Sequence, residues 1–277
     1  MSATHATQAS LQRLFKLNRS VPSAARYGEI EAIEAAWLEP ILAEQAALTP
    51  PLSPAPEIAQ LIEESIAEAD GDGRCSADFL ANAATREQFR AVVADYAVDG
   101  LTEAQNLFPA IPRLPIRAQM AVMRVLIDEF GCGNLQRAHS ELYMDLLREL
   151  ELPTDLASHL PDVSAETLAF VNCFYWLASR APYVEYFLGA LAYLEAYIPA
   201  GFSCFDAACR RLGIKHGLYY SEHIHIDGFH KQELQIAIRE YDRAQGCDFA
   251  KLWIGMTLLR RLLGESFETA VDRARAL

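Results

Sequence analysis

A short stretch between residues 223 and 230 carries three side chains that could hold a metal ion. His223, Asp227 and His230 lie four and three residues apart, and on an α-helix this spacing places them within about 60° of one another. The same stripe continues with Leu234, Ala237 and Tyr241. This is the pattern of a helix face that packs into a core, where imidazole and carboxylate groups without a partner are unfavourable. Histidine with aspartate on one buried face suits a metal ion, so we interpret this helix as one wall of a metal site.

Further charged residues interrupt the apolar faces of other predicted helices. Glu129 and Glu195 each stand at the end of such a face, and His139 stands at the start of one. Local violations of a binary pattern often mark functional sites, although a hydrogen-bonded residue near a helix end is the alternative for each of them. Glu103 stays open between two interpretations. It follows Thr102 in the predicted first turn of a helix, where the helix dipole alone favours a glutamate.

These residues together give the candidate metal ligands Glu103, Glu129, His139, Glu195, His223, Asp227 and His230. Seven oxygen and imidazole ligands without a thiolate are too many for one ion, and they suit two ions that carboxylates bridge. The ligand types favour iron or manganese, and zinc is less natural with so many carboxylates. The ferritin-like plan needs Glu-x-x-His on each of two helices. It is not met here, because position 136 before His139 is glutamine.

The composition restricts the class of partner and the compartment. A formal net charge of −13 on 277 residues argues against nucleic acid or an anionic membrane as the main partner, because both bind clustered Lys and Arg. The most apolar region, 168–202, is interrupted by charged residues and prolines, so we interpret it as core helices rather than a membrane span. The six cysteines include no Cys-x-x-Cys pair, and the N-terminus lacks the pattern of a signal peptide. We therefore expect a cytoplasmic protein with reduced thiols.

Helical periodicity dominates the chain and strand alternation is almost absent, which predicts an all-α protein with one main bundle. Proline and glycine clusters separate the predicted helices. From residue 102 onwards we expect helices over residues 102–110, 117–130, 137–150, 164–180, 183–198, 199–212, 249–263 and 266–276, besides the one that carries His223. We expect residues 1–95 to form an N-terminal helical extension packed on a core of residues 96–277, within one continuous domain.

The motif Asp128-Glu-Phe-Gly-Cys-Gly-Asn134, followed by His139, Glu195 and His223-x3-Asp227-x2-His230, resembles the haem-oxygenase-like di-metal oxidases and oxygenases, many of which are called iron-containing redox enzymes. The likeness covers about residues 100–240. It implies a haem-oxygenase-like helical bundle, with the ligands supplied by its core helices. Carried over by position, it implies as ligands Glu129, His139, Glu195, His223, Asp227 and His230. Glu103 stands 26 residues before Glu129, the offset of an additional ligand in some N-oxygenating members.

The resemblance implies a pair of Fe²⁺ ions with O2 as co-substrate, and manganese is the alternative metal. Family members carry out N-oxygenation, oxidative decarboxylation or C–C fragmentation. Glu103 favours N-oxygenation of a small amine or amino-acid-like metabolite in specialised metabolism. We expect a small-molecule substrate and neither nucleic acid nor membrane as a partner, and a homodimer stays open. As residues that shield the centre from water we expect Phe130, Tyr143, Phe187 and Tyr193.

Two other classes of function compete with this interpretation. The first is a helical protein whose acidic core binds metal without turnover, which predicts bound metal but no O2 consumption. The second is a haem-oxygenase-like protein without two metals, acting on haem or through a cysteine nucleophile. Haem degradation needs one proximal histidine rather than many carboxylates. The cysteine route needs a poised thiolate, and no cysteine in this sequence has evident acid or base neighbours.

Overall fold

A computed structural model describes residues 7–53, 56–67 and 74–277, apart from the side chains of Arg74 and Asp227. All regular secondary structure in these residues is helical, which confirms the predicted all-α class. The first elements are α1 (Gln8–Asn18), α2 (Ala24–Leu48), α3 (Ile58–Ala67), α4 (Arg74–Asn82), α5 (Arg86–Asp95), α6 (Ala97–Gly100), η1 (Phe108–Arg113), α7 (Ile116–Glu129), η2 (Gly131–Gly133) and η3 (Leu135–Arg137). They are followed by α8 (His139–Glu149), α9 (Leu156–His159), α10 (Ala165–Ser179), α11 (Val184–Gly201), α12 (Ser203–Leu212), α13 (Leu218–Gln245) and α14 (Phe249–Arg275).

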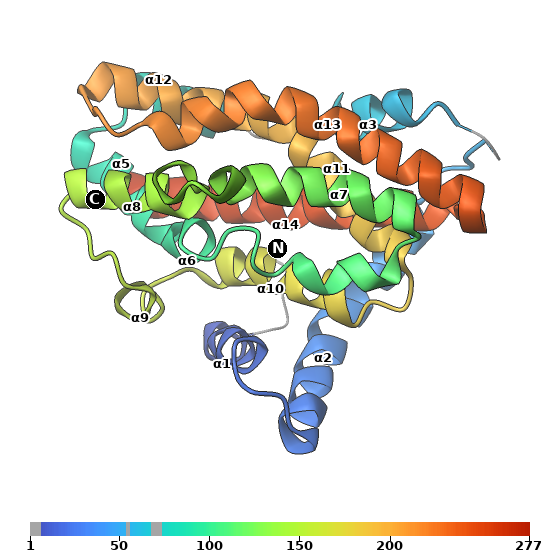
Figure 1. Cartoon of the computed structure of the whole chain (residues 1–277). Helices are drawn as coiled ribbons and strands as arrows, with labels where there is room; N and C mark the ends of the chain where they lie inside the picture. Colours follow the sequence, from blue (N-terminus) through green and yellow to red (C-terminus); the bar gives the residue numbers. More distant parts are fainter. Residues whose placement is uncertain (1–6, 54–55, 68–73) are drawn as a thin grey trace.

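The long helices α7, α10, α11, α13 and α14 form the bundle (Figure 1). α11 packs against both α13 and α14, α13 packs against α7, and α10 packs against α14. The crossing of α11 and α14 is close because each helix places a glycine there. A methyl group on Gly189 would overlap the carbonyl oxygen of Leu252, and one on Gly255 would overlap that of Tyr186. This close crossing holds α11, which carries Glu195, firmly in the bundle.

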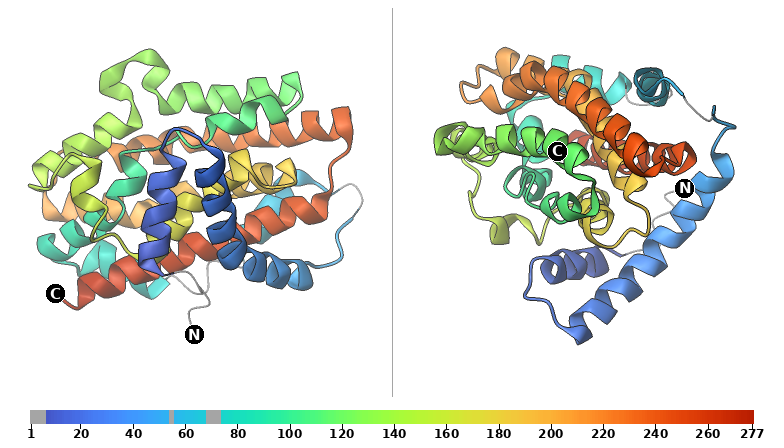
Figure 2. Two further views of the ribbon diagram at one scale, coloured as in Figure 1. Left: turned by 90° about the horizontal axis from the view of Figure 1, so that it is seen from below. Right: turned by 45° about the vertical axis from the view of Figure 1, so that its right-hand side comes forward.

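The N-terminal helices pack on this bundle. α1 and α2 lie together on one side of it (Figures 1 and 2), and buried residues of α1, α2 and α3 belong to the same hydrophobic core as the long helices. The guanidinium group of Arg180, after α10, donates to the buried carboxylate of Glu34 on α2. α4 packs on α12, and α5 packs on α14. These contacts support our proposal that residues 1–95 extend the core of residues 96–277 within one domain.

Three predicted helices differ from the structure. The helices predicted over 249–263 and 266–276 form one continuous helix, α14, which ends at Arg275, because the glycine at position 264 does not interrupt it. The helix predicted over 102–110 is wrong, because the chain after α6 forms turns up to η1. Within these turns Ala104 has a φ of 61°, a left-handed conformation that an α-helix does not contain.

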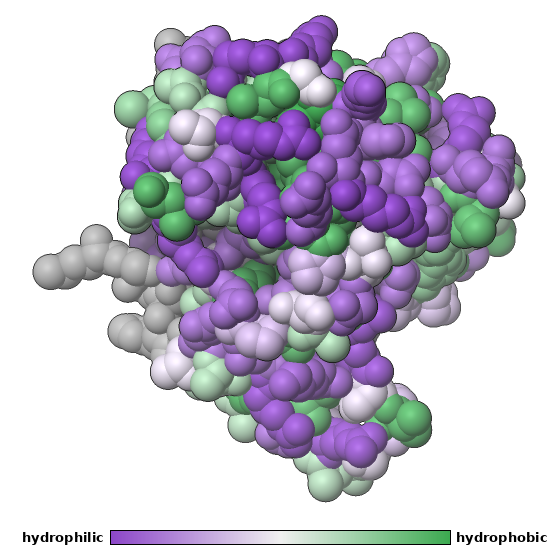
Figure 3. All heavy atoms as spheres, turned by 90° about the vertical axis from the view of Figure 1, so that its left-hand side faces the viewer, coloured by the Kyte–Doolittle hydropathy of each residue, from purple (hydrophilic) through white to green (hydrophobic). Residues whose placement is uncertain are grey.

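One stretch, Val184–Leu212, is long and apolar enough to cross a membrane by length and composition alone. Half of its most apolar window is buried inside the protein, and α11 within it packs on two other bundle helices. Burial of this kind is typical of core helices and agrees with the prediction of core helices over residues 168–202. The face shown in Figure 3 is mainly hydrophilic, with apolar residues in scattered small groups.

Candidate metal centre

Glu129, the last residue of α7, lies between two groups of candidate metal ligands. The first group consists of Glu103, Glu129, His139 and His223, and the second of Glu129, Glu195 and His230. Within each group the ligand atoms all lie within 4.8 Å of one another. Because Glu129 belongs to both groups, the two sets form one continuous centre in the core of the bundle.

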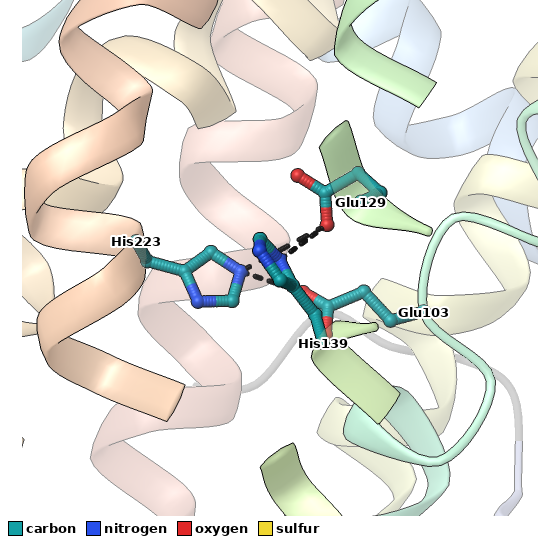
Figure 4. A group of neighbouring side chains, drawn as sticks. All are labelled: Glu103, Glu129, His139 and His223. Carbon is teal, nitrogen blue, oxygen red and sulfur yellow. Dashed lines mark hydrogen bonds and ion pairs between the residues drawn. The ribbon is translucent and has the colours of Figure 1, made fainter. Parts of the chain in front are cut away.

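Four side chains from four different parts of the chain converge in the first group (Figure 4). Glu129 comes from α7, His139 begins α8, His223 lies in α13, and Glu103 lies in the turns before η1. The Oε2 atom of Glu129 is 2.7 Å from Nδ1 of His139 and 4.0 Å from Nε2 of His223. The Oε1 atom of Glu103 is 2.9 Å from the same Nε2 atom of His223. The carboxylate of Glu129 therefore faces two imidazoles, and the carboxylate of Glu103 approaches one of them.

The second group lies on the other side of Glu129. The Nδ1 atom of His230 is 3.0 Å from Oε2 of Glu195 and 3.5 Å from Oε1 of Glu129. The two oxygens of Glu129 thus face different groups, Oε2 the first and Oε1 the second. This is the arrangement of a carboxylate that bridges two ions.

Tyr219, one turn before His223 on α13, orients the first group. Its carbonyl oxygen lies 2.7 Å from Nδ1 of His223, and a carbonyl can only accept, so Nδ1 carries the proton and the lone pair of Nε2 faces Glu103. The hydroxyl of Tyr219 donates to Oε1 of Glu103 at 3.2 Å. A lone pair and a carboxylate oxygen only 2.9 Å apart repel one another. A cation between them, or a second proton on the ring, removes that repulsion.

Burial and unsatisfied atoms test whether these residues fit a metal pair. Glu129, Glu195 and the three histidines are each at most 8% exposed. Oε2 of Glu103 is buried and makes no hydrogen bond among the described residues, and Oε2 of Glu129 and Nδ1 of His139 meet at 2.7 Å without the geometry of a hydrogen bond. Burial acts to raise the pKa of Glu129, but the neighbouring histidines outweigh it and hold that pKa well below its usual range. Buried carboxylates that stay charged need cations, so the residues fit a pair of divalent ions.

The structure brings together six of the seven predicted ligands. Asp227 lies in α13 between the two histidines, but its side chain is outside the described part of the structure. The alternative explanation of Glu103, a favourable charge at a helix start, is wrong, because residues 101–107 form turns rather than the first turn of an α-helix. That these residues bind metal stays a prediction.

The comparison with known proteins agrees with the composition of this centre. The family described as iron-containing redox enzymes matches residues 90–261, which is more than half of the chain and includes every described candidate ligand. This chain belongs to that family. The resemblance seen in the sequence is thereby confirmed, and the all-α bundle has the haem-oxygenase-like fold.

A curated relative in the same family is nitrosourea synthase from Streptomyces achromogenes subsp. streptozoticus. It is 28% identical over 153 residues, which cover 54% of this chain and 32% of the relative. The match therefore spans about a third of the length of that protein.

The protein has a cavity of about 720 Å³ beside the centre. Glu103, Glu129, Glu195 and His223 line it at the centre, and aromatic rings line much of the remainder. Two of the predicted shielding residues, Tyr143 and Tyr193, line it. Phe187 is instead buried in the hydrophobic core. Phe130 is 38% exposed and packs edge-on against Phe108 at the surface. Helical periodicity predicts that Phe187 and Phe130 lie on helices, but it does not predict which side of each helix meets the cavity.

Asp99 also faces this cavity, one turn before Glu103, and the sequence analysis missed it. Burial and the neighbouring charge of Glu103 raise the pKa of Asp99 to about 8. The sequence held no clear signal for it, because the chain between Asp99 and Glu103 leaves α6 and forms turns, so no helical spacing relates the two carboxyl groups. The cavity thus carries a second carboxyl group beside the candidate metal centre.

Proposed function

We propose that this iron-containing redox enzyme is an O2-dependent non-haem di-iron oxygenase or oxidase that acts on a small amine or amino-acid-like metabolite. The observation that supports it most is the position of Glu129, which offers one oxygen to each of two buried ligand groups. When bound there, a pair of Fe²⁺ ions would supply the activation of O2. Manganese is the alternative metal for the same ligands.

The chain's own residues have separable roles in this proposal. Glu103, His139 and His223 would hold one ion, and Glu195 and His230 the other, with Glu129 shared between them. Asp227 stays a predicted ligand of the pair. The carbonyl of Tyr219 keeps the proton of His223 on Nδ1, which leaves Nε2 as the metal-binding atom. The aromatic residues that line much of the cavity would limit the access of water to the substrate, as reactive oxidation chemistry requires.

The cavity supports a basic substrate. Asp99 and Glu103 place two carboxyl groups on its wall beside the centre, where the basic nitrogen of an amine or guanidine would find acceptors for its hydrogen bonds. We therefore favour N-oxygenation over oxidative decarboxylation or C–C fragmentation by the same site. The relative named for the synthesis of a nitrosourea, a class of compound with an N–N=O group, supports this preference. A place in natural product biosynthesis agrees with the same relative.

Anaerobic reconstitution with Fe²⁺ followed by a count of iron per chain tests the proposal. We expect two irons in the wild type and fewer in Glu195→Ala and Asp227→Ala. Glu240→Ala serves as the control, because Glu240 lies on α13 in a surface ion pair with Arg243. Iron-dependent O2 uptake with candidate amines, followed by mass analysis of the product, then separates addition of oxygen to nitrogen from loss of CO2 or chain cleavage. Two irons with no O2 uptake for any substrate would favour the non-catalytic metal-binding alternative.

For the cellular setting we propose a cytoplasmic enzyme with a small-molecule substrate and no nucleic acid or membrane partner. The negative net charge supports this. Whether the protein forms a homodimer is a question for sedimentation or light scattering.

A further inference from the structure

Asp128, the residue before Glu129, contacts His230 of the second group at the ring nitrogen that does not face Glu195 and Glu129. The Oδ2 atom of Asp128 lies 3.5 Å from Nε2 of His230, while Nδ1 of the same ring faces Glu195 and Glu129. The His230 side chain is 1% exposed and that of Asp128 is 35% exposed. The imidazole of His230 therefore stands between an inner pair of carboxylates and one outer carboxylate that reaches towards the surface.

A histidine that binds a metal through one ring nitrogen commonly donates the N–H of the other nitrogen to a carboxylate. The carboxylate fixes which nitrogen carries the proton, holds the plane of the ring and raises the basicity of the binding nitrogen. In His230 a proton on Nε2 would face Oδ2 of Asp128 across 3.5 Å, an ion-pair contact rather than a short hydrogen bond. The lone pair of Nδ1 would then be directed at the space beside Glu195 and Glu129.

We propose that Asp128 is a positioning residue for His230, which sets its Nε2–H tautomer and thereby strengthens metal binding in the second group. The inference rests on the proposed function insofar as it takes the second group to hold a metal ion. It assigns to this residue a role that the ligand pattern in the sequence does not contain.

Cys132 supports Asp128 from the surface. Its thiol donates to Oδ1 of Asp128 at 3.2 Å, so the two oxygens of Asp128 are divided between the thiol and His230. This hydrogen bond raises the pKa of Cys132, which keeps the thiol in its protonated, donating form. Cys132 is exposed and lies in the η2 segment that follows α7, with a left-handed φ of 51°. A line of contacts thus runs from an exposed thiol through Asp128 to a candidate metal ligand.

The test compares Zn²⁺ binding by wild type, Asp128→Asn, Asp128→Ala, Cys132→Ser and Cys132→Ala. Zn²⁺ is the probe because it needs no exclusion of O2. We expect Asp128→Ala to weaken the binding of one of two ions by roughly 10- to 100-fold, and Asp128→Asn to weaken it less, because the amide oxygen still accepts from Nε2. Cys132→Ser should bind Zn²⁺ as tightly as the wild type, because a hydroxyl also donates to Asp128. Cys132→Ala should bind one of the two ions more weakly. Asp145→Asn is the control, since Asp145 is an exposed carboxylate on α8 paired with Arg148.

A second readout separates positioning from a general loss of stability. In Zn²⁺-loaded protein with ¹⁵N-labelled histidine, ring nitrogen shifts report the tautomer of each imidazole. We expect His230 in the Nε2–H form in the wild type, with its N–H proton signal moved upfield in Asp128→Ala. An Nδ1–H tautomer, or unchanged shifts together with unchanged affinity in Asp128→Ala, would overturn the inference. Two bound ions without O2 uptake would overturn the proposed function alone, and a wild type that binds no metal would overturn both.

Discussion

Replacement of Glu129 by glutamine should remove both metal ions, whereas the loss of Glu195 should remove one. Oε2 of Glu129 is 2.7 Å from Nδ1 of His139, and Oε1 is 3.5 Å from Nδ1 of His230. Glutamine keeps the size of the side chain but is neutral, and its amide nitrogen cannot bind a cation. The group that faces the amide nitrogen therefore loses its shared ligand. The other group keeps only a neutral oxygen, which cannot offset the repulsion between two neighbouring cations, so we expect neither ion to stay bound.

The size of the effect follows from binding linkage. An ion supplied at 100 times its Kd stabilises the folded protein by about 2.7 kcal/mol, so two independent ions add about 5 kcal/mol. In proteins of 150–250 residues each kcal/mol moves Tm by roughly 2–4 °C. Saturation of the wild type should therefore raise Tm by roughly 10–20 °C. The rise should nearly vanish in Glu129→Gln and fall to about half in Glu195→Gln.

Thermal melts of metal-free protein with increasing Zn²⁺, paired with metal analysis of the desalted protein, measure both quantities. Glu240→Gln is the matched control on the surface of α13, where Glu240 pairs with Arg243. If Glu129→Gln kept two ions per chain, or rose in Tm as far as the wild type does, the bridging role of this carboxylate would be refuted.

Three further predictions concern residues around the centre. Tyr219→Phe removes the hydroxyl that donates to Glu103 but keeps the backbone carbonyl, so Co²⁺ titration should show one ion bound several-fold more weakly and the second unchanged. Because the folded pKa of Asp99 is raised to about 8, the stability that its protonated form provides is present below about pH 4 and is lost as the pH rises through about 8. The Tm of chelator-treated wild type should fall over that range, and Asp99→Asn should flatten the fall. Gly131→Ala and Gly133→Ala both place a side chain at positive φ, each costing about 1–2 kcal/mol. Only at Gly131 would the methyl group also overlap the backbone just before α8, so urea unfolding should show the larger loss there, and only this variant should lose metal from the first group.

The burial of four candidate ligands that stand on regular helices could be predicted from the sequence. Glu129, Glu195, His223 and His230 each occupy a position that the apolar period of their helix assigns to the core, and the structure buries all four. This signal is local, because a charged residue on an apolar stripe can be recognised without its partners. The apolar period of a helix therefore predicts that such a residue is buried. It does not predict which residues of other helices the side chain meets, because that depends on how whole helices pack.

The parts that escaped prediction depend on contacts between distant segments. The turns around Glu103 replace a predicted helix, and Ala104 holds a left-handed conformation that no local preference of alanine explains. Such a conformation persists only where the surrounding structure fixes it. Asp128 escaped for a different reason, since it lies outside the apolar stripe of α7 and only the folded chain shows that it reaches His230.

The break after α7 explains how one carboxylate can meet ligands of two different helices. A continuous helix from position 116 to 149 would place His139 about 15 Å along the axis from Glu129, because each residue advances the helix by about 1.5 Å. The chain instead turns at Gly131, whose φ is 61°, and passes so close to itself before α8 that a side chain at this glycine would overlap the backbone. His139, as the first residue of α8, is thereby returned to 2.7 Å from Glu129. The other oxygen of Glu129 stays directed at His230 on α13, which packs along α7. The turn at Gly131 therefore brings His139 of the first group to Glu129, and the packing of α7 on α13 brings His230 of the second group to it. Glu129 belongs to both groups because it stands where α7 ends.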